Sequence, residues 1–136
     1  RLDTQKAASA VGALSFEEQG EGPNGERGTI AVDPLLFGDV VLARKETPAA
    51  YHLAVVVDDA FQDVTLVTRG NDLFAAVHTQ RVLQALLRLP PPAYAHHKLI
   101  LDEHGRKFSK RDAAATLRAL REDGVTPDRI RARLFG

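Results

Sequence analysis

Residues 64–100, VTLVTRGNDLFAAVHTQRVLQALLRLPPPAYAHHKLI, contain the pattern that decides the fold class. The β-branched run at 64–68 is typical of a buried parallel strand that leads into a polar loop. Apolar residues then recur at helical spacing until three prolines at 90–92 end the helix. Residues 94–101 form the next strand-like run. This order of strand, helix and strand predicts an α/β fold with a parallel sheet, whose site lies at the carboxyl ends of the strands.

Residues beyond this segment continue the pattern. Asn71 or Asp72 can cap the helix that follows the first strand. Residues 112–122 predict another helix, which Gly124 ends. A final helix begins at Thr126-Pro127, because a threonine cap followed by proline suits the first helical turn.

The first part of the chain has shorter elements. Its N-terminal residues predict a short helix, and residues 20–28 contain four glycines and a proline, which is typical of a turn or loop. β-branched or apolar runs at 29–32 and 39–43 predict short strands. We therefore expect a small β-rich appendage with a glycine-rich loop at residues 1–48, followed by a second part at 49–136.

Two lysines flank a serine directly after a polar turn at residues 102–106. The ammonium groups of Lys107 and Lys110 are compact charges on flexible stems, which suits a phosphate that moves during a reaction. The Ser109 hydroxyl and the N-terminus of the following helix attract the same anion. A solvated basic turn is an equally simple interpretation of so short a motif.

The composition is that of an ordinary folded domain. The 136 residues are 44% hydrophobic and 26% charged, which is enough to bury a core. The absence of cysteine excludes disulfides and thiolate metal sites within this sequence, and the adjacent His96 and His97 would face opposite sides of a strand. We therefore expect no metal site. No apolar run approaches the roughly 20 residues that cross a bilayer, so we expect a cytoplasmic protein without a membrane partner.

The formal net charge of zero conceals an uneven distribution. Residues 1–97 carry 8 Lys/Arg against 12 Asp/Glu, and residues 98–136 carry 10 against 6. The basic C-terminal part suits the phosphates of ATP or RNA, although a solvated helix face explains it nearly as well. The sequence begins at Arg1 and has no methionine, so we expect part of a larger protein.

Three blocks together resemble the glutamyl branch of the class I aminoacyl-tRNA synthetases. Residues 107–111, KFSKR, are similar to that family's Lys-Met-Ser-Lys-Ser signature. Residues 51–59, YHLAVVVDD, are similar to its Tyr-x-x-Ala-x-Val-Val-Asp-Asp segment, and residues 67–72, VTRGND, to its Val-x-Arg-Gly-x-Asp segment. The blocks occur in the family's order and spacing, which is far more specific than any one block.

The pattern of residues 49–61 is ambiguous without this resemblance. Three consecutive valines at 55–57 favour a strand by propensity. A helical stripe through the same residues is also present, at Leu53, Val56, Val57 and Ala60. The resemblance implies a helix, and a helix is the expectation adopted.

The resemblance also implies roles for individual residues. Tyr51 and Arg69 would contact the glutamate substrate, since a guanidinium binds a carboxylate through paired N–H groups and a tyrosine hydroxyl orients polar groups. Asp72 would belong to the ATP site, although it is equally suited to cap a helix. Leu99 and Ile100 match positions whose backbone holds the adenine of ATP.

The implied reaction activates glutamate. Its carboxylate attacks the α-phosphate of ATP to give glutamyl-adenylate and pyrophosphate, and the acyl group then passes to RNA. Lys110, with Lys107 and Ser109 assisting, would neutralise charge on the phosphates, and Mg2+ would share that task. Since this mechanism needs no acid–base residue, we expect Asp58 and Asp59 to be structural or orienting groups.

Part of the family's pattern is missing. The sequence contains neither the His-Ile-Gly-His-type signature nor the arginine–serine segment expected near the N-terminus. The chain thus resembles only the second half of a Rossmann-type catalytic domain with C-terminal helices, and we expect it to be inactive on its own.

Further blocks distinguish subgroups of the family. Residues 28–34, 37–45 and 112–135 resemble the compact glutamyl-Q tRNA(Asp) synthetases, which glutamylate the queuosine base of tRNA(Asp). An ordinary glutamyl-tRNA synthetase, with tRNA(Glu) as partner, is one alternative. A non-catalytic nucleotide- or RNA-binding module derived from this fold is another. Any zinc site would lie upstream of this sequence, and we expect the full-length protein to be a monomer.

Overall fold

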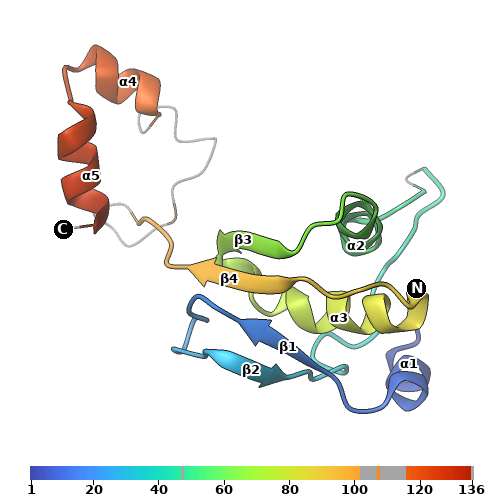
Figure 1. Ribbon diagram of the computed structural model, residues 1–136. Helices are drawn as coiled ribbons and strands as arrows, with labels where there is room; N and C mark the ends of the chain where they lie inside the picture. The colour runs from blue at the N-terminus through green and yellow to red at the C-terminus, as the bar shows by residue number, and fades with distance from the viewer. Residues whose placement is uncertain (47, 102–106, 108–115, 136) are drawn as a thin grey trace. The chain divides into compact units, whose positions relative to one another are not determined.

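The computed structural model describes residues 1–46, 48–101, 107 and 116–135. The chain divides into two compact units, Arg1–Lys98 and Leu99–Gly136. The first unit contains the sheet and helices α1 to α3, and the second contains α4 and α5 (Figure 1). Among the described residues, no helix combines the length and the apolar composition that a membrane span requires.

The first unit is built on one mixed sheet, with its strands in the order β2-β1-β4-β3. Its strands are β1 (Ser15–Glu18), β2 (Gly28–Ala31), β3 (Leu66–Gly70) and β4 (Ala93–His97). Strands β1 and β2 are antiparallel, whereas β4 runs parallel to both of its neighbours. The β3–β4 register places Arg69 opposite His96, so the carboxyl ends of these two strands lie side by side.

The predicted unit of strand, helix and parallel strand is present, which confirms the α/β fold class. Strand β3 leads through a short 3-10 helix, η1 (Asn71–Leu73), into α3 (Ala76–Leu87), and β4 then returns parallel to β3. Helix α3 ends at Arg88, whose φ of 58° is left-handed, just before the proline run.

Helix α2 (Tyr51–Phe61) settles the ambiguous segment as a helix, as the family resemblance implied. Val56 is buried at 2% exposure, whereas the neighbouring Val57 is 45% exposed. Helix α2 packs against α3, and α3 also packs against α1 (Thr4–Val11). Helix α1 begins at Asp3, whose carboxylate accepts a hydrogen bond from the N–H of Lys6.

The core of the first unit joins the sheet to α3 through aromatic rings. Phe16 of β1, Tyr94 of β4, and Phe74 and Val77 around the start of α3 are all buried. The ring of Phe16 meets Phe74 and Tyr94 edge to face, with 5.7 Å between centroids in both pairs. Such pairs contribute about 0.5–1.5 kcal/mol each beyond the burial of their area.

Several predicted boundaries were wrong. Residues 39–43 form no strand, and Val40 makes only an isolated bridge with Leu2. Strand β1 was not predicted, because Phe16 is the only apolar residue among its four residues and none of them is β-branched. Strand β3 is not fully buried: it begins at Leu66, which is 42% exposed. Strand β4 ends at His97, before the apolar residues 99–101.

The cap predicted for the helix after β3 was also wrong. Asn71 and Asp72 belong to the separate helix η1, and the N-cap position of α3 is Ala75, which makes no side-chain cap hydrogen bond. The expected division at residue 48 stays a prediction. Residues on both sides of it nevertheless share the sheet, since β1 pairs with both β2 and β4.

The second unit contains two short helices, α4 (Leu117–Glu122) and α5 (Pro127–Phe135). The Thr116 hydroxyl caps α4 by accepting the N–H of Ala119 at 3.1 Å. Gly124, with a φ of 76°, follows the end of α4 as predicted. The Thr126 hydroxyl accepts the N–H of Arg129 at 3.4 Å, which confirms the predicted start of α5.

Candidate functional site

Arg69 lies at the carboxyl end of β3, where four hydrogen bonds hold its guanidinium. Its Nε donates to Nε2 of His96 at 3.1 Å. Its Nη2 donates to the carbonyl of Leu73 at 3.1 Å and to Oε1 of Gln80 at 3.0 Å. Its Nη1 donates to the hydroxyl of Tyr51 at 3.4 Å. Hydrogen bonds on three sides therefore fix the plane of the guanidinium.

The structure brings together Tyr51 and Arg69, the two residues predicted to bind glutamate. Tyr51 is the first residue of α2 and is 51% exposed. A guanidinium has five N–H groups, and the four hydrogen bonds leave one N–H of Nη1 without a partner in the part of the chain that the structure describes. The Tyr51 hydroxyl accepts from Nη1, so its own proton remains available to another acceptor. Two neighbouring donors at an accessible position match the two oxygens of a carboxylate.

A buried acid–histidine pair lies behind Arg69. Nδ1 of His96 lies 2.6 Å from Oε2 of Glu18, and both side chains are fully buried. The other carboxylate oxygen of Glu18 accepts the backbone N–H groups of His96 and Gly20, each at 2.8 Å. The ring of Phe74 packs edge to face against His96, with 5.2 Å between centroids. The imidazole is therefore held on its Glu18 side, on its Arg69 side and across its face.

Glycine is required beside this pair because β4 approaches very closely. A Cβ built on Gly20 would lie 2.1 Å from the carbonyl oxygen and 2.6 Å from the nitrogen of His96. Both of these are backbone atoms, which cannot rotate away. Gly20 is thus the position at which the chain leaving β1 passes against the backbone of β4.

Ionisable groups near Arg69 respond to burial and to its charge. Burial lowers the pKa of His52, and the positive charge of Arg69 lowers it further. Partial burial raises the pKa of Asp59, and this effect outweighs the opposing attraction of Arg69. Burial also raises the pKa of Tyr94, whose hydroxyl accepts a hydrogen bond from the buried Gln84 at 3.1 Å. Burial therefore disfavours the charged forms of His52, Asp59 and Tyr94.

The residues predicted for the ATP site lie in both units. Asp72 belongs to η1, three residues after Arg69, and is exposed. In the second unit, Leu99 is half-buried and Ile100 is 51% exposed. Lys107 is exposed and forms an isolated antiparallel bridge with Leu101.

Two of the predicted catalytic residues, Ser109 and Lys110, lie outside the described residues, as does Arg111. Their roles stay predictions. Across residues 1–46, 48–101, 107 and 116–135, no group of three or more His, Asp or Glu side chains is arranged to hold a metal ion.

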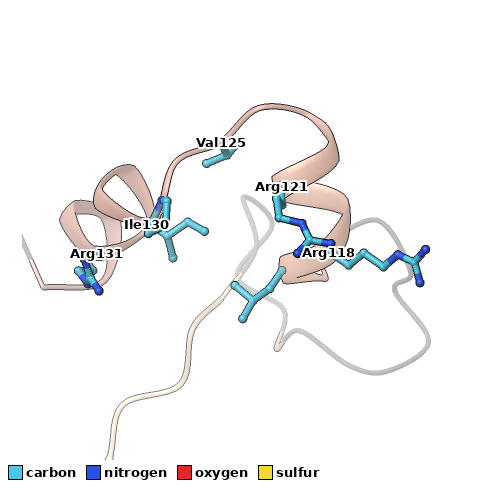
Figure 2. A pocket seen from close by; sticks show the side chains of 7 residues that line it. Arg118, Arg121, Val125, Ile130 and Arg131 are labelled. Atoms are coloured by element: carbon cyan, nitrogen blue, oxygen red, sulfur yellow. The ribbon is translucent and has the colours of Figure 1, made fainter.

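A separate pocket of about 580 Å3 lies between α4 and α5 in the second unit (Figure 2). Leu117, Val125, Pro127 and Ile130 supply its apolar lining, and Arg118, Arg121 and Arg131 add guanidinium groups. Arg118 pairs with Glu122 at 3.1 Å, and Arg131 pairs with Asp128 at 3.0 Å. This pocket combines an apolar floor with positive charge.

Three partners in the site were not predicted from the sequence: Glu18, Gln80 and His96. The sequence contained a signal for two of them. Glu18 lies two residues after Phe16 in β1, and His96 lies two residues after Tyr94 in β4. Because residues two apart in a strand point to the same face, each polar residue shares the buried face of its aromatic neighbour. A polar residue at such an inward position normally needs a buried partner.

Comparison with known proteins shows the family to which the chain belongs. The family model for the catalytic domain of class I tRNA synthetases (E and Q) matches residues 19–135. The glutamyl-Q tRNA(Asp) synthetase of Rhodobacter capsulatus is 47% identical over 140 residues, which cover all of this chain and 48% of that protein. The glutamate–tRNA ligase of a Synechococcus species is 46% identical over 101 residues, which cover 70% of this chain and 21% of that protein.

A solved structure supports the same relationship. The glutamate-tRNA synthetase of Elizabethkingia anophelis superposes with a TM-score of 0.59 at 27% sequence identity, covering 75% of this chain and 20% of that one. The chain spans about half the length, or less, of the curated relatives that it matches. The match to the family model, together with the α/β fold, places the chain in the class I aminoacyl-tRNA synthetases, a family of ligases, as a part of the E and Q catalytic domain.

Proposed function

We propose that the protein to which this chain belongs activates glutamate with ATP and transfers it to the queuosine base of tRNA(Asp). The observation that carries the proposal is the geometry at Arg69. Its guanidinium keeps one Nη1 hydrogen available beside the exposed Tyr51 hydroxyl, as far as the described residues define its partners. This arrangement suits a carboxylic acid substrate.

Glutamate would place one carboxylate against these two donors. One oxygen accepts the remaining N–H of Arg69 and the other accepts the Tyr51 proton, so two residues share the recognition. Burial raises the pKa of the nearby Asp59, and the positive charge of Arg69 opposes this shift. Arg69 retains its positive charge at any physiological pH.

ATP would be bound by the residues that the family resemblance assigns to it. Lys107 and Lys110 neutralise charge on the phosphates, and the Ser109 hydroxyl adds a hydrogen bond. The backbone at Leu99 and Ile100 holds adenine, and Asp72 is a further candidate for binding ATP. The protein thereby orients the glutamate carboxylate for attack on the α-phosphate, with pyrophosphate as the leaving group.

The names of the relatives support the choice of acceptor. Glutamyl-Q tRNA(Asp) synthetases from Rhodobacter capsulatus and Nocardia farcinica are 47% and 48% identical over all and 71% of this chain, respectively. A glutamate–tRNA ligase at 46% identity over 70% of the chain favours tRNA(Glu) as the second candidate.

Charging assays with the protein as its gene encodes it test both steps. We expect glutamate-dependent exchange of pyrophosphate into ATP, followed by transfer of labelled glutamate to tRNA(Asp) that carries queuosine. Transfer to tRNA(Glu) instead would favour the second candidate. Absence of any glutamate-dependent exchange would refute glutamate activation altogether.

The 136-residue chain by itself provides a further comparison. It lacks the first signature of the class, so we expect it to support no glutamate-dependent exchange. Vigorous exchange by the purified chain would show that these residues alone form a complete activation site.

A further inference from the structure

The buried pair of Glu18 and His96 has no role in the activation chemistry described above. We infer that both are positioning residues, which hold the Arg69 guanidinium in the orientation that receives the substrate carboxylate. This inference rests on the proposed function for the identity of the substrate. We call the chain of hydrogen bonds from Glu18 through His96 to Arg69 the relay, and all of it lies inside the first unit.

The hydrogen bonds define where the protons lie. Nε of Arg69 can only donate, so Nε2 of His96, 3.1 Å away, must accept and carries no proton. The ring proton of the neutral imidazole is therefore on Nδ1, where it is donated to Oε2 of Glu18 at 2.6 Å. With the second Glu18 oxygen accepting two backbone N–H groups, both oxygens act as acceptors, as expected of an ionised carboxylate.

This proton arrangement determines the direction in which Arg69 presents its remaining donor. The bond from Nε to His96 and the two bonds from Nη2 fix one edge of the guanidinium. The guanidinium carbon also lies over the ring of Tyr94, 5.5 Å from the ring centroid. Only the Nη1 end then faces Tyr51. Without the His96 acceptor the Nε edge would be free, and the guanidinium could reorient.

Glu18 also has a structural task, which the test must separate from positioning. Strands β1 and β4 share a single register pair, Glu18 opposite Tyr94, so the Glu18 carboxylate contributes to joining them. A purely structural role needs only the hydrogen bond between His96 and Glu18. The positioning role also needs the hydrogen bond between His96 and Arg69.

Two substitutions at His96 separate these hydrogen bonds. In His96→Asn the amide lies near the position of Nδ1, so it can still donate to Glu18 but cannot reach Arg69. In His96→Gln the amide oxygen reaches the position of Nε2, so it can accept from Arg69 but leaves Glu18 without its imidazole donor. His97→Asn is the matched control, because His97 is exposed and its Nδ1 bonds only the neighbouring Lys98 carbonyl among the described residues.

The kinetic prediction concerns glutamate alone. In the protein as its gene encodes it, His96→Asn should raise the KM for glutamate about tenfold or more, because it removes a hydrogen bond to a charged group. The KM for ATP should stay near that of the wild type and of His97→Asn, whereas the Tm should fall, because the buried imidazole also packs against Phe74. His96→Gln should retain more of the glutamate affinity while lowering the Tm. Wild-type kinetics in His96→Asn would overturn the positioning role.

A spectroscopic measurement tests the relay without reference to activity. Nitrogen NMR of the same protein should show His96 as the neutral tautomer protonated on Nδ1, with a scalar coupling across the hydrogen bond from Nε of Arg69 to Nε2. Both signals should be absent in His96→Asn. A His96 protonated on Nε2 would refute the relay even if glutamate is activated. Conversely, an intact relay in a protein that does not activate glutamate would refute only the proposed substrate.

Discussion

At the scale of single residues, the Arg69 guanidinium combines a permanent charge with a fixed orientation. Backbone, amide, imidazole and phenol groups each accept one of its hydrogen bonds. A lysine in the same place would have one ammonium group on a flexible stem and could not reproduce this set of hydrogen bonds. The position therefore requires arginine for its geometry as well as for its charge.

Substitution of Arg69 by lysine tests this requirement. Arg69→Lys should weaken glutamate binding by about 1.5–3 kcal/mol, the usual contribution of hydrogen bonds to a charged group. Tyr51→Phe, which removes only the hydroxyl, should have a smaller effect in the same direction. Steady-state KM values for glutamate and ATP provide the measurement. Arg27→Lys, at an exposed ion pair with Glu21, is the control and should leave both KM values unchanged.

Two histidines of the first unit, His52 and His78, make stability depend on pH. Nδ1 of His78 accepts the N–H of Asp33 at 2.8 Å, so the ring must be neutral there, and burial lowers its pKa despite the opposing charge of Asp33. Burial likewise lowers the pKa of His52. Below the ordinary value of 6.5 the unfolded chain then binds more protons than the folded one, so the free energy of unfolding falls as the pH falls.

Urea denaturation at two pH values checks this sign. The midpoint should be lower at about pH 5.5 than at about pH 7.5, a range that spans histidine titration. His78→Asn keeps an acceptor for the Asp33 N–H but does not titrate, so it should show a smaller change. An unchanged pH dependence in this variant would exclude His78 as a source. The raised pKa of Asp59 acts in the opposite direction, nearer to its own lower titration range.

At the scale of elements, the junction of β1 with β4 connects the antiparallel part of the sheet to the parallel part. A single register pair joins the two strands, and beyond it Gly20 passes directly against the β4 backbone. The N–H of Gln19 also donates to the carbonyl of Tyr94 at 2.7 Å. Because so few contacts join β1 to β4, the loss of any one of them should lower the stability of the sheet.

Gly20→Ala should damage this junction. The added methyl would overlap the His96 backbone, and overpacking against fixed atoms costs about 1–3 kcal/mol or more. The expected result is a lower denaturation midpoint, together with a broken Glu18–His96 hydrogen bond in NMR spectra. Gly25→Asn is the comparison, because no atom lies within 4 Å of its Cβ position, so the strain of its φ of 86° is the cost of the substitution and the Glu18–His96 hydrogen bond should stay intact. Equal stability of the two variants would contradict the close approach.

At the scale of the whole molecule, charge is divided along the chain. Residues 1–97 have 8 basic against 12 acidic side chains, whereas residues 98–136 have 10 against 6. Two of the arginines that line the α4–α5 pocket are paired with acidic neighbours along their own helices. Arg121 also lines this pocket and has no ion pair among the described residues.

If the second unit binds tRNA, the Arg121 guanidinium should neutralise a phosphate of the tRNA backbone. Arg121→Gln should weaken tRNA binding at low salt and make the salt dependence shallower, by about one unit of slope for each phosphate that Arg121 neutralises. The Kd for tRNA, measured at several salt concentrations, gives both quantities. Arg27→Gln in the first unit is the charge-matched control. An identical slope in the wild type and Arg121→Gln would place Arg121 outside the tRNA interface.

The sequence predicted those elements whose signals are local. The strand–helix–strand order around α3, Gly124 after α4 and Thr126 before α5 were all confirmed, because residue spacing and capping chemistry act within a few residues. The helix at Tyr51–Phe61 needed the family resemblance as well, since a run of valines favours a strand when tertiary packing is unknown. Strand β1 was missed because Phe16 is its only apolar residue and none of its residues is β-branched.

The sequence by itself determined the family and the α/β class, and it predicts that Tyr51 and Arg69 bind glutamate. Only the tertiary structure decided what surrounds them. Glu18 and His96 are 78 residues apart, and nothing local indicates that β1 lies beside β4. Their hydrogen bond depends on a sheet order that brings distant segments together, and on a glycine that allows the backbones to approach. The sequence therefore shows that residue 69 is an arginine, whereas the orientation of its guanidinium depends on residues that only the folded sheet brings together.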